Sequence, residues 1–91
     1  MAISVLIPTV LRKYTMGRDQ VHVEGATVRD VIRSLEEKFG GITAGLFQTD
    51  GALKPFINLY INDEDIRFLN ELDTPVQGND TVTILPAIAG G

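Results

Sequence analysis

The sequence contains no cysteine. This absence excludes a disulfide framework, a thiolate metal site, an iron–sulfur cluster and a cysteine nucleophile. No stretch approaches the roughly 20 apolar residues that a membrane-spanning helix needs. The first residues, 1–5, lack the basic segment and the long apolar run of a secretory signal. We therefore expect a cytoplasmic protein with no membrane partner.

Signatures of catalysis are equally scarce. His22 is the single histidine, and its valine neighbours in an expected strand predict that it faces solvent rather than acting as a base. Neither Ser4 nor Ser34 lies in a motif with a histidine that could activate it. The glycines at 40–41 lack the lysine and hydroxyl residue of a phosphate-binding loop. The acidic run 63–65 lacks the spacing of a calcium loop and predicts a solvated turn. We expect a chain that is not an enzyme and binds no metal or cofactor.

The composition is that of one soluble globular domain, with 91 residues, 44% hydrophobic and 22% charged. The net charge of −4 argues against nucleic-acid binding, which relies on a basic surface. Between Asp50 and Asp80, seven acidic residues stand against two basic ones, Lys54 and Arg67. This excess has two interpretations. It is either a solvated acidic surface or a complement to a basic patch on a partner, which would mainly raise the association rate.

Alternating apolar residues predict the strands of one sheet. Four strands are expected at 3–7, 20–24, 56–61 and 81–85, with a short edge strand at 66–68. The first two are close enough in sequence to form a hairpin. The first and last are expected to pair in parallel at the centre of the sheet.

One helix is predicted after the hairpin. Thr27 is the expected N-cap, and Asp30 completes a capping-box pattern. The apolar stripe consists of Val28, Val31, Ile32, Leu35 and Phe39. The glycines 40–41 end the helix, a short helical turn is expected at 42–47, and a loop follows at 48–51. This order predicts an α+β fold of the β-grasp type, a mixed sheet of four to five strands with one main helix across one face.

The last residues form the remaining feature, Gly90-Gly91 at the end of the sequence. We expect a domain over residues 1–86 and a flexible tail over 87–91, which spans up to about 20 Å when counted from Pro86. Glycine has no Cβ, so such a tail can enter a narrow channel. A carboxylate is a poor electrophile, but adenylation by ATP would let a sulfur or amine nucleophile attack Gly91. Sulfur carried by a chain without thiols would sit on Gly91. The alternative is a frayed terminus without function.

Three segments carry a resemblance to a known family. Residues 82–91, VTILPAIAGG, resemble the C-terminus of the ubiquitin-like sulfur-carrier family. That family includes the small subunit of molybdopterin synthase and the thiamin-pathway carrier. Residues 7–12, IPTVLR, and 56–68, FINLYINDEDIRF, resemble its CysO-type branch of cysteine biosynthesis. The similarity extends over essentially the whole chain and implies a ubiquitin-like β-grasp fold.

The resemblance implies that the chain is a substrate of other enzymes. An E1-like adenylyltransferase/sulfurtransferase would use ATP to activate Gly91 and convert it to a C-terminal thiocarboxylate, a 1-thioglycine. The thiocarboxylate would donate sulfide to a cysteine synthase, and a metal-dependent peptidase would release cysteine. Nucleotide and metal would be bound by these partners. Gly90 and Ala89 would thread into the partner's active site.

The docking surface and the pathway each leave alternatives. Period-two alternation places Leu6, Tyr60 and Leu85 on the sheet face away from the helix, where ubiquitin-like proteins dock. They are otherwise scattered exposed residues, which any surface has. The Gly-Gly end is shared across the family, so three other functions stay open. These are a molybdopterin synthase small subunit, a ubiquitin-like modifier that joins Gly91 to lysines, and a β-grasp binding module with an incidental tail.

Overall fold

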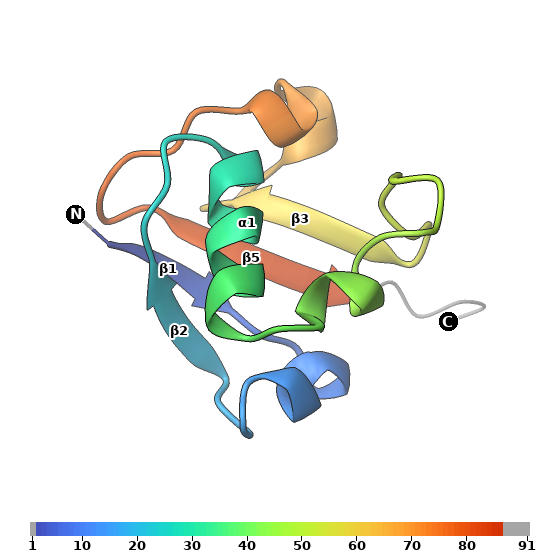
Figure 1. Cartoon of the computed structure of the whole chain (residues 1–91). Coiled ribbons are helices and arrows are strands. Elements are labelled where there is room, and N and C mark those ends of the chain that lie inside the picture. Colours follow the sequence, from blue (N-terminus) through green and yellow to red (C-terminus); the bar gives the residue numbers. More distant parts are fainter. Residues whose placement is uncertain (1, 87–91) are drawn as a thin grey trace.

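The fold is a five-stranded sheet with one α-helix across one face (Figure 1). The structure is a computed structural model and describes residues 2–86. Its elements, with η for a 3₁₀ helix, are β1 (Ile3–Leu6), η1 (Thr9–Tyr14), β2 (Gln20–Val23), α1 (Val28–Lys38), η2 (Ile42–Gly45), β3 (Ile57–Ile61), β4 (Glu64–Asp65), η3 (Ile66–Phe68), η4 (Glu71–Asp73) and β5 (Thr81–Pro86). The predicted ubiquitin-like β-grasp fold is confirmed.

The last strand lies at the centre of the sheet. The strand order is β2-β1-β5-β3-β4, so β5 separates β1 from β3. β5 runs parallel to β1, with Leu6 opposite Thr83. It runs antiparallel to β3, with Ile57 opposite Pro86. The predicted parallel pairing of the first and last strands is therefore confirmed.

The core lies between the sheet and α1. Each strand buries alternate side chains, as Val5, Leu59 and Val82 illustrate at 1% exposure or less. The predicted apolar stripe of the helix is buried against them, and Phe39 belongs to it although α1 ends at Lys38. The opposite face of the sheet carries no helix in the part of the chain that the structure describes (Figure 1). We call this surface the open face.

Side chains fix both ends of α1. The Thr27 hydroxyl accepts a hydrogen bond from the Asp30 amide at 3.2 Å, as the capping-box pattern predicts. The Asp30 carboxylate accepts one from the Ala26 amide at 3.3 Å. At the other end, Glu36 accepts hydrogen bonds from the Gly41 amide at 2.8 Å and the Thr43 hydroxyl at 2.7 Å. These bonds lower the pKa of the Glu36 carboxyl, with the Gly41 amide as the largest cause.

The prediction of an edge strand at 66–68 is wrong. The edge strand is β4, two residues earlier, and 66–68 forms the 3₁₀ helix η3. The cause is local. Asn62 takes a left-handed conformation with φ 55°, so the chain turns back at once and Asp65 lies opposite Tyr60. The Asp65 carboxylate then accepts a hydrogen bond from the Arg67 amide at 2.9 Å and starts η3.

The Glu36 contacts predict a specific dependence of stability on pH. Glu36→Gln should lower the melting temperature at pH 7, because an amide accepts these hydrogen bonds more weakly than a carboxylate. A carboxyl whose pKa is lowered by folding contributes stability above its ordinary value of 4.5. That contribution is lost as the pH falls through the folded pKa. The difference in melting temperature between the wild type and the variant should therefore shrink between pH 7 and pH 3.

Glu37→Gln is the matched control, since Glu37 is exposed on the same helix. Its melting temperature should follow that of the wild type at every pH. An equal difference between the wild type and Glu36→Gln at pH 7 and pH 3 would contradict the account.

Candidate functional site

The sheet determines where β5, the last strand, ends. β1 and β5 finish at one end of the sheet, and β2 and β3 begin there, because Leu6 pairs with both Gln20 and Thr83 and Pro86 pairs with Ile57. We call this the tail end. In Figure 1, β5 reaches it at the right-hand side of the molecule. The expected site residues Ala89, Gly90 and Gly91 lie outside the described residues and stay predictions.

The three expected docking residues lie on the open face. Leu6, Thr83 and Tyr60 form one row across β1, β5 and β3, because each is paired with the next in the register. Leu85 lies two residues beyond Thr83, toward the tail end. Leu6 is 36% exposed and Leu85 46%. The structure thus places them on β5 and on the two strands beside it, near the end of β5.

A shallow groove of about 310 Å³ opens beside this row at the tail end. Its lining includes Leu6, Leu85 and Arg12. The Arg12 Nε donates a hydrogen bond of 3.1 Å to the Ile7 carbonyl, just past the end of β1. The alternation of residues in the strands does not predict that Arg12 lines this groove. Its position in the first turn after Pro8, just beyond the end of β1, is the sequence feature that could have indicated it.

An ion pair between a buried carboxylate and an exposed guanidinium borders the open face at its β4 edge. Asp65 is 8% exposed, and its carboxylate contacts the Arg67 guanidinium at 2.7 Å. The side-chain hydrogen bond from Arg67 is the largest cause that lowers the pKa of Asp65, followed by the Arg67 amide. The same pair raises the pKa of Arg67. The prediction of a solvated turn over 63–65 is therefore wrong for Asp65, which is buried, and holds for Asp63. Glu64 is solvated as predicted but belongs to the strand β4.

The other residues considered for catalysis lie outside the row of Leu6, Thr83 and Tyr60. His22 is exposed on β2, as expected, and its carbonyl accepts a hydrogen bond from the Lys38 ammonium at 3.2 Å. The Ser34 hydroxyl donates to the Glu24 carbonyl at 2.7 Å. Among residues 2–86 no group of three His, Asp or Glu side chains could hold a metal ion. Within the same residues, no helix is long and apolar enough to span a membrane.

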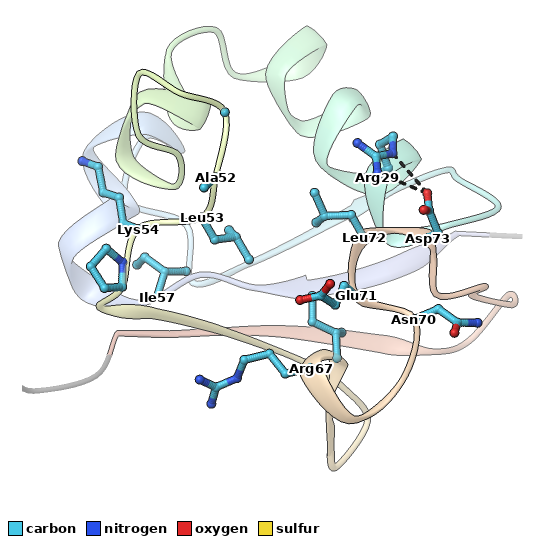
Figure 2. A pocket seen from close by; sticks show the side chains of 13 residues that line it. Arg29, Ala52, Leu53, Lys54, Ile57, Arg67, Asn70, Glu71, Leu72 and Asp73 are labelled. Carbon is cyan, nitrogen blue, oxygen red and sulfur yellow. Dashed lines mark hydrogen bonds and ion pairs between the residues drawn. The ribbon is translucent and has the colours of Figure 1, made fainter.

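A second cavity lies on the helix side of the sheet, away from the open face. It measures about 440 Å³ and separates the 51–57 segment from the 66–73 segment. Figure 2 shows Leu53 and Leu72 pointing toward each other across it, with the Arg29–Asp73 ion pair of 3.2 Å at its upper rim. Its lining combines apolar side chains such as Leu53 and Leu72 with charged ones such as Lys54, Arg67 and Glu71. It brings together no nucleophile and base.

The sequence and fold of this chain are similar to those of known proteins. A model described as the ThiS family matches residues 5–91. Sulfur carrier protein CysO of Mycobacterium tuberculosis is 45% identical over 93 residues, which cover 100% of both proteins. Small archaeal modifier protein 3 of Haloferax volcanii is 37% identical over 68 residues, 75% of this chain and 73% of that protein.

Solved structures support the same relationship. A chain in the crystal structure of the Amycolatopsis orientalis BexX/CysO complex superposes with a TM-score of 0.91 and 48% sequence identity. The match covers 99% of this chain and 100% of that chain.

Neighbouring residues of β5 predict a direct test of the two sheet faces. Ile84→Ala should destabilise the fold by about 2–5 kcal/mol, because Ile84 is 2% exposed in the core. Leu85→Ala should change the free energy of unfolding by no more than about 0.5 kcal/mol, because Leu85 faces solvent. Urea denaturation of both variants measures these values. Equal losses would show that the open face is packed against something in the folded domain.

Proposed function

The chain belongs to the ThiS family, and from this premise we propose that it is a sulfur carrier for cysteine biosynthesis. The match to the sulfur carrier protein CysO carries the proposal, since it covers both proteins over their full lengths at 45% identity. The lack of cysteine agrees with it, because no side chain offers a thiol that could hold sulfur. The carboxyl group of Gly91 is the position that we propose instead. The role is that of a substrate for partner enzymes rather than of a catalyst.

The proposed site of sulfur attachment is the carboxyl carbon of Gly91. An E1-like adenylyltransferase would join this carboxylate to the α-phosphate of ATP, with release of pyrophosphate. Hydrosulfide would then attack the carbonyl carbon, and AMP would leave with the electron pair of the C–O bond. The product is a thiocarboxylate on Gly91, and the proton of hydrosulfide passes to solvent. ATP would be bound by the partner.

The described part of the chain supports this role by its shape. β5 lies in the middle of the sheet and stops at Pro86, and five residues follow it. When extended, these residues span about 17 Å, enough to reach an active site while the domain stays outside. Leu6, Tyr60 and Leu85 would contact the partner beside the tail.

The expected later steps use two further partners. In a cysteine synthase, the thiocarboxylate sulfur would attack the β-carbon of an activated serine such as O-phosphoserine, and phosphate would leave. The product would be a thioester between Gly91 and the new cysteine. Its α-amine would then attack the Gly91 carbonyl carbon and displace the sulfur as a thiol, which leaves cysteine joined to Gly91 by an amide bond. A metal-dependent peptidase would hydrolyse that bond and release cysteine. A molybdopterin synthase subunit would instead transfer its sulfur to a pterin, so consumption of the thiocarboxylate by O-phosphoserine and a cysteine synthase distinguishes the two.

A second candidate function is protein modification. It is favoured by the similarity to small archaeal modifier protein 3 over three quarters of this chain. In that function a lysine amine, rather than hydrosulfide, would attack the activated Gly91 and form an isopeptide bond. The two functions share the adenylation step and differ in the nucleophile.

Intact-mass spectrometry tests the proposed sulfur attachment. The chain is incubated with ATP, hydrosulfide and the E1-like enzyme from the same genome. We expect a gain of about 16 Da, the difference between sulfur and oxygen. Deletion of Gly91 should abolish the gain, because the shortened chain no longer presents its carboxylate at the required position. The melting temperature of the deletion variant verifies that the fold is intact.

Two outcomes would contradict the proposal. One is the absence of the mass gain while the enzyme still releases pyrophosphate with the wild-type chain. The other is a ladder of conjugates on added proteins with no thiocarboxylate, which would establish the modifier function.

The docking surface makes a separate prediction. Leu85→Asp should slow thiocarboxylate formation at least tenfold at limiting carrier concentration, because a charge would have to be desolvated in the interface. Leu69→Asp is the matched control, since Leu69 is 37% exposed and lies after η3 outside the sheet. It should stay within about twofold of the wild type. Equal rates for the two variants would exclude Leu85 from the docking surface.

A further inference from the structure

The two ends of the sheet collect different segments of the chain. Because β1 and β5 finish at the tail end and β2 and β3 begin there, the segments 7–19 and 46–56 lie at that end. The segments 24–27, 62–64 and 77–80 lie at the opposite end, where β5 begins. Figure 1 shows the 77–80 turn in orange at the left and the last residues of β5 at the right.

The two segments that flank the strands at the tail end are basic. They contain four basic residues and two acidic ones, Asp19 and Asp50, and the last turn of α1 adds Glu36, Glu37 and Lys38 at this end. We call the four basic residues the basic collar: Arg12, Lys13, Arg18 and Lys54. Arg18 and Lys13 are exposed, and the other two are half-buried. They come from η1, from the turn before β2 and from the approach to β3, so all four lie at the tail end, and Arg12 lines a groove together with Leu85 of β5.

The opposite end is acidic. Its three segments contain four acidic residues and no basic one, and the structure describes all of these positions. The four are Glu24, Asp63, Glu64 and Asp80. Two further acidic residues of the 50–80 region, Asp65 and Asp73, are already paired with arginines. The net charge of −4 therefore hides a separation of charge along the strand direction.

The arginines of the collar differ from the others in their partners. Arg29, Arg33 and Arg67 each form an ion pair with an aspartate. Among residues 2–86, Arg12 and Arg18 form none. The Arg12 guanidinium is instead held at the mouth of the tail-end groove by its bond to the Ile7 carbonyl. Its remaining donors are available to a partner.

We infer that the basic collar orients the chain tail-first onto partner enzymes whose active-site mouth is acidic. The inference rests on the proposed function and adds the charge of the surface that receives the tail. An acidic mouth attracts the collar and repels the acidic end, so encounters with the tail forward are favoured. Arg12 and Arg18 pair with carboxylates of the partner at that mouth. In this orientation Arg12 and Arg18 contact the partner, and the acidic end of the sheet faces away from it.

Salt-dependent association kinetics test the inference. Stopped-flow association with the E1-like enzyme is measured for the wild type, for the variant Arg12→Gln/Arg18→Gln and for the control Arg29→Gln/Arg33→Gln. The two variants lose the same charge, and Arg29 and Arg33 are exposed on the helix. At about 0.03 M salt, we expect the collar variant to associate about tenfold more slowly than the wild type and the control to stay within about twofold. The difference should shrink at about 0.3 M salt, where screening is strong.

Two results would overturn the inference. Equal slowing of both variants would mean that only net charge matters, and faster association of the collar variant would mean that the mouth is basic. Each protein is also assayed for the mass gain at Gly91. If the wild type gains no sulfur, the sulfur-carrier function fails, whereas the association rates still decide whether the collar orients the encounter.

Discussion

The parallel pairing of β1 with β5 is the constraint on which the rest of this structure depends. It places the last strand at the centre of the sheet, where β1 and β3 hold it from both sides. Its inward residues, Val82 and Ile84, are fixed in the core between those neighbours. The end of β5 is therefore anchored in the core. Under the proposed function, the residues after Pro86 would enter a partner without any rearrangement of the domain.

The same pairing explains how the residues of β5 are divided between the core and the open face. Alternation along β5 sends Ile84 to the core and Leu85 to the open face, and the register aligns Leu6 and Tyr60 with it. Parallel pairing also brings the end of β1 next to the end of β5. The loops that carry the basic collar consequently lie at the end of the sheet where β5 finishes, while the acidic turns lie at the other end. The strand order thus determines both the apolar residues and the charges of the proposed docking surface.

Much of this could be predicted from the sequence, because the signals were local and periodic. The helix boundaries followed from Thr27 and from the apolar stripe, and the strand faces followed from period-two alternation. The β4–η3 corner could not be predicted in this way. It depends on the left-handed backbone conformation of Asn62 and on the ion pair between Arg67 and the buried Asp65. Neither feature produces a periodic pattern in the sequence. The separation of charge also required the topology, since the collar residues are far apart in the sequence.

The central claim is that this chain carries sulfur on Gly91, and the state of the protein in its own cell tests it most directly. The measurement is top-down fragmentation of the chain purified from its natural host during growth on sulfate as the sulfur source. The account predicts C-terminal fragment ions in which one oxygen of Gly91 is replaced by sulfur. Fragments with an unmodified Gly91 in every molecule, alongside isopeptide conjugates of the same residue, would contradict it.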